Sequence, residues 1–127
     1  MFKKHLESGK SGEELAAVLL RENGYKIIAR NYKTKLGEID IIAKDKDTLC
    51  FVEVKLRNSD KFGLPQEAVL KSKQLHIAKT ALSYLKENNL LDAKARFDVV
   101  AINYSEKDKP CLDLIKDAFE LDERYVI

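Results

Sequence analysis

Two strongly apolar segments of the chain, residues 39–43 and 49–54, are each interrupted by an acidic residue. Their length and composition predict strands that are buried on both faces of a sheet. Asp40 lies in the first segment, Glu53 lies in the second, and Lys55 follows two residues later. An unpaired charge in such a strand costs on the order of several kcal/mol. We therefore expect another group to compensate these charges, and the identity of that group indicates the function.

The polar residues 45–47 between the two segments predict a β-hairpin. If the chain reverses in a two-residue turn, Asp40 and Glu53 become cross-strand neighbours with Cβ atoms about 4.5–5.5 Å apart. Lys55 then shares their face of the sheet, because side chains alternate along a strand. A register shifted by one residue would send the two acids to opposite faces. The turn lacks the Asn-Gly or Asp-Gly pair that favours this geometry, so a bulge or a longer loop stays open.

Adjacent carboxylates repel each other unless a cation lies between them. Lys55 is one candidate cation, and it would make the three residues a buried ion-pair cluster without catalysis. A divalent metal ion is the other candidate, because it would neutralise the carboxylates of both Asp40 and Glu53. Carboxylate oxygens suit Mg²⁺ or Mn²⁺, which keep several water molecules. The residues alone leave both interpretations open.

The composition is that of one soluble globular domain spanning residues 1–127, with 45% hydrophobic and 35% charged residues. The two cysteines, Cys50 and Cys111, form no CxxC pair. We therefore expect neither a metal–thiolate site nor a disulfide framework, and a reducing cytoplasm fits. No apolar stretch approaches the ~18 residues of a membrane span, and the first residues lack the apolar segment of a secretory signal. The sequence thus predicts a cytoplasmic protein.

Hydrophobic periodicity and capping signals predict an α/β fold with a mixed sheet flanked by helices, in the order αβββαββ. Ser11 and Glu14 form a capping-box pattern at the start of the first helix, and Gly24 ends it. The expected strands are 25–32, 39–44, 48–56, 97–103 and a short one at 112–115, and the second helix is 66–87. The short last strand is a candidate sheet edge. Asp98 interrupts the fourth strand, and we interpret it as a structural hydrogen-bond or ion-pair partner.

The formal net charge of +2 is too weak to indicate a nucleic-acid-binding protein by itself. Local basic residues would have to attract DNA phosphates. The candidates on or just before the second helix are Arg57, Lys61, Lys71, Lys73 and Lys79. A solvated helix face explains these lysines about equally well.

The residues Asp40, Glu53 and Lys55 resemble the PD-(D/E)XK nuclease motif. The chain as a whole resembles the YraN family of small bacterial proteins, which are similar to archaeal Holliday junction resolvases. The matching stretches are GEELAA at 12–17, GY at 24–25, RN at 30–31, GEID at 37–40, FVEVK at 51–55, Arg57, RFDVV at 96–100 and KDAF at 116–119. The D…ExK triplet alone is a weak signal, whereas this ordered set is highly specific for the family.

The resemblance implies a restriction-endonuclease-like fold and a metal-dependent endonuclease, with branched DNA as a candidate substrate. It implies Mg²⁺ or Mn²⁺ held by Asp40, Glu53, the carbonyl of Val54 and an acid on the first helix. We assign that acid to Glu13, which borders the inward-facing apolar stripe, whereas the glutamate after it has a capping role. Lys55 would orient the attacking water or bind the scissile phosphate.

Two other classes of function stay open. One is a non-catalytic DNA-binding module of the same fold, and the other is an assembly protein whose acidic cluster is a structural ion-pair network. A homodimer is expected for a junction-cleaving enzyme, because symmetric cuts need two clusters related by a two-fold axis. Its candidate interfaces are the strand at 112–115 and the apolar residues 125–127.

Overall fold

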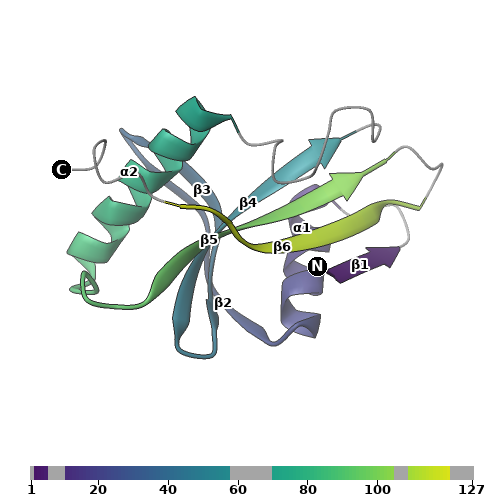
Figure 1. The fold of residues 1–127 in the computed structure, drawn as a ribbon, viewed down its shortest axis with the longest axis horizontal. Helices are drawn as coiled ribbons and strands as arrows, with labels where there is room; N and C mark the ends of the chain where they lie inside the picture. Colours follow the sequence, from purple (N-terminus) through teal and green to yellow (C-terminus); the bar gives the residue numbers. More distant parts are fainter. Residues whose placement is uncertain (1, 6–10, 58–69, 105–108, 121–127) are drawn as a thin grey trace.

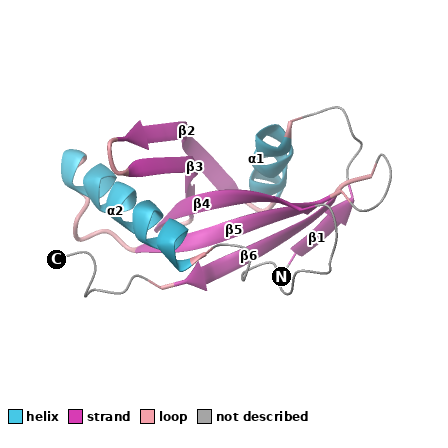
Figure 2. Cartoon of the chain, turned by 90° about the horizontal axis from the view of Figure 1, so that it is seen from above, coloured by secondary structure: helices cyan, strands magenta, loops and turns pink. Residues whose placement is uncertain are grey.

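The computed structural model describes residues 2–5, 11–57, 70–104 and 109–120, and for residues 2–5 it describes the backbone alone. The elements in chain order are β1 (Phe2–His5), α1 (Gly12–Glu22), β2 (Tyr25–Thr34), β3 (Gly37–Asp45), β4 (Thr48–Arg57), α2 (Lys71–Glu87), β5 (Ala95–Asn103) and β6 (Cys111–Phe119). The strands form one sheet in the order β1-β6-β5-β4-β3-β2, in which β4 and β5 run parallel. The helices α1 and α2 lie on opposite faces of this sheet (Figures 1 and 2).

The predicted α/β fold, a mixed sheet flanked by helices in the order αβββαββ, is confirmed from α1 onward. Ser11 Oγ accepts a hydrogen bond of 3.2 Å from the backbone N–H of Glu14, as the capping pattern predicts. The helix ends at Glu22, and Gly24 follows with a φ of 85°, a conformation that glycine adopts without strain. Local sequence signals therefore set both ends of α1.

The second helix is shorter than predicted. It begins at Lys71 rather than at residue 66, because Leu70 is extended with φ −64° and ψ 152°. Residues 66–69 lie outside the described part of the chain, and the end at Glu87 agrees with the prediction. Neither described helix is long and apolar enough to cross a membrane.

The edges of the sheet differ from the prediction. The strand expected at 112–115 to form an edge is the interior strand β6, which pairs with β5 on one side and β1 on the other. It also continues to Phe119 through the charged residues Lys116 and Asp117, where the register with β5 shifts and Asp117 has a φ of 53°. The sequence did not predict β1 or this extension, because neither carries a clear apolar alternation.

The hairpin of β3 and β4 has the predicted register. The paired residues run from Asp45 opposite Thr48 to Ile41 opposite Val52, so the turn has two residues. Lys46 in this turn adopts a φ of 57°, which non-glycine residues seldom adopt. The turn forms without a glycine because burial of both strand faces already specifies the register.

The hairpin strands carry the centre of the core, as their apolar sequences predict. Residues of β4 alternate between the two faces: Cys50 and Val52 pack in the cluster that contains α1, whereas Phe51 packs in the cluster that contains α2. Each of the three is at most 1% exposed. The same alternation directs Glu53 toward the face that α2 covers.

Asp98 is fully buried and links strands that are distant in sequence. Its carboxylate accepts hydrogen bonds from Tyr25 Oη at 2.7 Å, Arg96 Nε at 3.0 Å and the backbone N–H of Asp117 at 2.9 Å. Arg96 Nη2 also donates to Asp45 Oδ2 at 2.6 Å, and this bond holds the pKa of Asp45 below its usual range. The prediction that Asp98 is a structural partner is confirmed.

Replacing Asp98 with alanine should be strongly destabilising, because Tyr25, Arg96 and an amide would each lose a buried acceptor. Breaking a buried ion pair from one side costs about 3–5 kcal/mol. Urea unfolding should show this loss for Asp98→Ala. Asp47→Ala is the control, since its 3.0 Å pair with Lys94 has both side chains at least 70% exposed and its loss should leave stability nearly unchanged. Equal losses in the two variants would contradict the assignment.

Candidate active site at the fork of two strands

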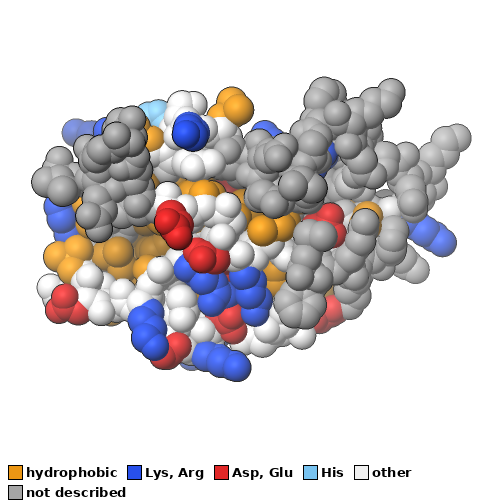
Figure 3. Space-filling view, viewed as in Figure 1, with side chains coloured by type: hydrophobic (Ala, Val, Ile, Leu, Met, Phe, Trp, Pro, Cys, Tyr) orange, Lys and Arg blue, Asp and Glu red, His pale blue; other side chains and the backbone are white. Residues whose placement is uncertain are grey.

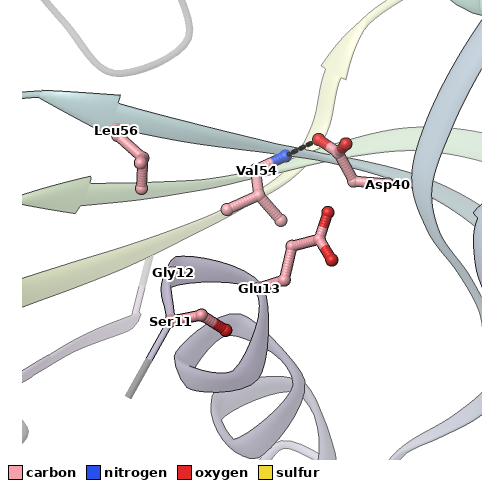
Figure 4. Close-up of a pocket in the computed structure, with 6 residues that line it drawn as sticks. All are labelled: Ser11, Gly12, Glu13, Asp40, Val54 and Leu56. Carbon is pink, nitrogen blue, oxygen red and sulfur yellow. Dashed lines mark hydrogen bonds between the residues drawn. The ribbon is translucent and has the colours of Figure 1, made fainter. Parts of the chain in front are cut away.

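The ladder between β3 and β4 ends at Ile41 and Val52, and we call the separation beyond this pair the fork. Just past it, Asp40 Oδ2 accepts a 2.8 Å hydrogen bond from the backbone N–H of Val54 (Figure 4). A side chain of β3 thus satisfies an amide of β4 that a backbone carbonyl would satisfy in a continuing ladder. The bond fixes one oxygen of Asp40 at the mouth of the fork.

Glu53 lies close to Asp40, as the hairpin register predicts, and the two carboxyl groups influence each other's pKa. Glu53 is only 8% exposed. Burial, followed by the charge of Asp40, raises the pKa of Glu53 to about 7. Burial also raises the pKa of Asp40, and the hydrogen bond from Val54 opposes that shift. Two carboxylates this close repel each other when both are ionised, and a cation between them would remove that cost.

A pocket of about 260 Å³ opens next to the fork, and α1 forms its other wall (Figure 4). Its lining residues are Ser11, Gly12, Glu13, Asp40, Val54 and Leu56. Glu13 extends from the first turn of α1 toward Asp40, and its charge contributes to raising the pKa of Asp40. Glu13 Oε2 accepts a 3.1 Å hydrogen bond from Asn31 Nδ2.

The structure therefore brings Glu13, rather than Glu14, to the acidic pair. Glu14 instead accepts a 2.8 Å hydrogen bond from Arg30 Nη1 of β2. Ser11 caps the helix from the residue before this turn, so the cap sets the direction in which Glu13 leaves α1. The placement agrees with the choice made from the apolar stripe of the helix.

Two lysines face Glu53 from different elements. Lys55 follows it on β4, is exposed and lowers the pKa of Glu53 to a small degree. Lys73 approaches from α2, and its Nζ lies 3.7 Å from Glu53 Oε1. The charge of Lys73 lowers that pKa more than the charge of Lys55 does.

Sequence reasoning treated Lys73 only as a candidate DNA contact and missed its position at the acidic pair. The available signal was the alternation of β4, which places Glu53 on the same face as Phe51 and hence under α2. Using that alternation to place Lys73 requires knowledge of where α2 packs on the sheet. It also requires the start of the helix at Lys71, which the sequence pattern did not predict.

The other basic candidates are spread around the fork. Arg57 ends β4 and is half-buried, Lys71 is exposed at the start of α2, and Lys79 is half-buried further along that helix. Lys61 lies outside the described part of the chain. Among the described candidates on α2, Lys73 is the one that lies within 4 Å of the acidic pair.

The donor atoms at the fork fit a hard divalent cation. Asp40 and Glu53 supply carboxylate oxygens, and burial raises the pKa of both acids. No group of three His, Cys, Asp or Glu side chains converges within the described ranges. A hard cation bound here would have these two carboxylates as ligands, water in the rest of its shell, as Mg²⁺ prefers, and Glu13 across the pocket.

The raised pKa of Glu53 predicts a pH-dependent stability. An unfolded glutamate titrates near ~4.3 and the folded one at about 7, so the folded protein binds the proton more tightly. The stabilising contribution is present below the unfolded pKa and is lost as pH rises through about 7. Glu53→Gln removes this loss and should be more stable than the wild type at pH 8, by ~1 kcal/mol or more.

Thermal unfolding without divalent cations between pH 5 and pH 8 checks this prediction. The difference between Glu53→Gln and the wild type should shrink toward pH 5. Asp92→Asn is the control, because Asp92 is exposed in a loop. If the stability difference between Glu53→Gln and the wild type is the same at pH 5 and pH 8, Glu53 does not titrate with a raised pKa in a buried site.

Comparison with known proteins identifies the family of this chain. The model of "Uncharacterised protein family UPF0102" matches residues 12–102. A "UPF0102 protein" of Syntrophus aciditrophicus is 55% identical over 119 residues, which cover 93% of this chain and 92% of the relative. A "UPF0102 protein" of Desulfosudis oleivorans is 44% identical over 94% of this chain and 95% of its own.

"UPF0102 protein GSU0650" of Geobacter sulfurreducens is 48% identical over 89% of this chain and 88% of its own. Among solved structures, "Structure of EndoMS-dsDNA2 complex" is similar at 23% identity and a TM-score of 0.36, covering 74% of this chain and 37% of that chain. That likeness is too distant to support a functional argument. The sequence matches are close and nearly full-length, and they include the segments that build the fork. The chain therefore belongs to the UPF0102 family, the YraN family that its motifs resemble.

Proposed function

We propose that this protein is a metal-dependent endonuclease that hydrolyses phosphodiester bonds of DNA at the fork. One observation carries the proposal: half-buried Asp40, fixed by the Val54 N–H, lines an open pocket with Glu13, and buried Glu53 lies close enough to raise the pKa of its own carboxyl through the charge of Asp40. Two acids kept this close raise each other's free energy when ionised, and a divalent cation removes that cost. Acids with perturbed pKa values at or beside a pocket are typical of catalytic sites.

The residues that would hold Mg²⁺ or Mn²⁺ are Asp40, Glu53 and the carbonyl of Val54, with Glu13 across the pocket. In a strand, the N–H and C=O of one residue point to the same side. The Val54 carbonyl therefore faces the fork, because its N–H donates to Asp40 there. When bound, the cation would supply a water of lowered pKa and stabilise the extra negative charge on phosphorus.

The protein's own side chains would position the substrate. Lys55 lies two residues beyond Glu53 on β4 and is exposed, so its ammonium is accessible to the scissile phosphate or the attacking water. The N–H of Val54 holds Asp40 in one orientation, which keeps a carboxylate oxygen directed at the pocket. Each of these groups acts from a strand rather than from a loop, so the geometry is rigid before substrate binds.

DNA is the proposed substrate class, and branched DNA is the candidate that the family resemblance favours. Arg57, Lys71 and Lys73 lie on or just after the elements that form the site, β4 and α2, and are the proposed phosphate contacts; Lys61 and Lys79 are further candidates. Figure 3 shows Lys and Arg side chains intermixed with Asp and Glu on the face it displays. Phosphate contacts would therefore come from a few basic residues beside the fork rather than from a broad basic surface.

The homodimer stays a prediction, but one proposed interface is wrong. The strand at 112–115 pairs on both sides within the sheet, so it offers no free edge. Residues 125–127 lie outside the described part of the chain.

A structural ion-pair network is the second candidate, and the 3.7 Å contact between Lys73 and Glu53 favours it. In this alternative the lysine already satisfies the acids, and Mg²⁺ or Mn²⁺ would not bind. A non-catalytic DNA-binding module is the third candidate. Titration with Mn²⁺ separates the network from the other two, and a cleavage assay separates the enzyme from the binding module.

The decisive experiment is Mn²⁺-dependent cleavage of labelled linear, flap and four-way-junction DNA by the purified protein. Wild-type protein should cleave at least one of these, and Asp40→Asn should lower the rate by ~10²-fold or more, because the cation loses a ligand. Asp47→Asn, an exposed acid in the turn of the same hairpin, should keep the wild-type rate. Equal rates for wild type and Asp40→Asn would remove Asp40 from the catalytic site.

Lys55→Ala should lower turnover far more than DNA affinity, since its proposed contact is at the reacting phosphate. Single-turnover rates give the first quantity, and binding in Ca²⁺ gives the second. Lys44→Ala is the matched control, as another exposed lysine of the hairpin. A loss of affinity with unchanged turnover would make Lys55 an ordinary phosphate contact.

A further inference from the structure

The contact between α2 and the acidic pair is made by one side chain. Lys73 Nζ lies 3.7 Å from Glu53 Oε1, and the side chains of Lys73 and Glu53 are 49% and 10% exposed. The ammonium therefore reaches from solvent to a nearly buried carboxylate. Water can solvate the ammonium of Lys73 far better than the carboxylate of Glu53.

The position of Lys73 on its helix is electrostatically unfavourable. It lies in the first turn of α2, which contains no acidic residue and where the unpaired backbone N–H groups leave partial positive charge. A lysine in this turn is repelled by the helix, unlike a lysine in the last turn. The attraction of Glu53 offsets this repulsion and holds the ammonium at the fork.

We infer that Lys73 is the internal counter-ion of Glu53, and that a divalent cation must displace its ammonium to bind the acidic pair. The inference rests on the proposed function, because it concerns the same pair of carboxylates. A divalent cation between Asp40 and Glu53 would carry twice the charge of the ammonium and contact both acids, whereas the ion pair that Lys73 makes within the described residues is with Glu53. Replacement of the ammonium by the cation should therefore be favourable. Breaking the ion pair between Lys73 and Glu53 nevertheless weakens cation binding.

Removal of the lysine charge should consequently strengthen cation binding. Lys73→Met keeps much of the side-chain length and should lower the Kd for Mn²⁺ by about 3- to 10-fold in calorimetric titration of the full chain. Lys73→Arg keeps the charge and should bind as the wild type does. Lys71→Met is the matched control, because Lys71 is exposed in the same helical turn; its Kd should change by less than about twofold.

A second measurement does not depend on comparing affinities. Without divalent cations, Lys73→Met should melt below the wild type, since Glu53 loses its counter-ion, and saturating Mn²⁺ should remove most of that difference. Circular dichroism establishes that each variant is folded before titration.

The outcomes separate this inference from the proposed function. Equal Kd values for Lys73→Met and wild type would overturn the counter-ion role while leaving the metal site intact. A lower Kd for Lys71→Met, equal to that of Lys73→Met, would also overturn it, because general helix charge would then explain the effect. Binding of Mn²⁺ by neither wild type nor Lys73→Met would overturn the inference together with the metal site.

Discussion

The separation of β3 from β4 is the constraint on which the site depends. A continuing ladder would pair the N–H of Val54 with a backbone carbonyl and leave no space between the strands. The fork instead places Asp40 against that N–H and directs Asp40 and Glu53 toward each other. The buried residues on both sides of the hairpin hold the strands together up to this point, so the acids are placed by the rigid core and not by a loop.

The sheet contains two acidic clusters with opposite electrostatic character. Near the hairpin turn, Asp45 and Asp98 are matched by Arg96, Tyr25 and a backbone N–H, and every bond is short. That cluster is a satisfied network and stabilises the packing of distant strands. At the fork the acids outweigh the cation within 4 Å of them in the described structure, and their pKa values rise. Of these two clusters, the fork is the one where an added cation would stabilise the folded protein more.

The helices complete the fork from opposite faces of the sheet. The capped first turn of α1 directs Glu13 into the pocket, and the first turn of α2 brings Lys73 to Glu53. Both contributions come from helix starts, where side chains project beyond the packed body of the helix. Glu13 brings a carboxylate from one face and Lys73 brings an ammonium from the other. The net charge of the site can therefore change, because the lysine side chain can move into solvent while the carboxylates stay in place.

The sequence predicts the hairpin, its two-residue turn and a common face for Asp40 and Glu53 just beyond the ladder, because strand alternation and turn length are local and leave one register that buries the apolar residues. It also determined the cap of α1, and with it the choice of Glu13. Tertiary structure alone decided that β1 covers β6, that α2 begins at Lys71, and that Lys73 contacts Glu53. Each of these joins segments far apart in the chain, and such contacts depend on how helices and strands dock across the whole sheet, which no local pattern records.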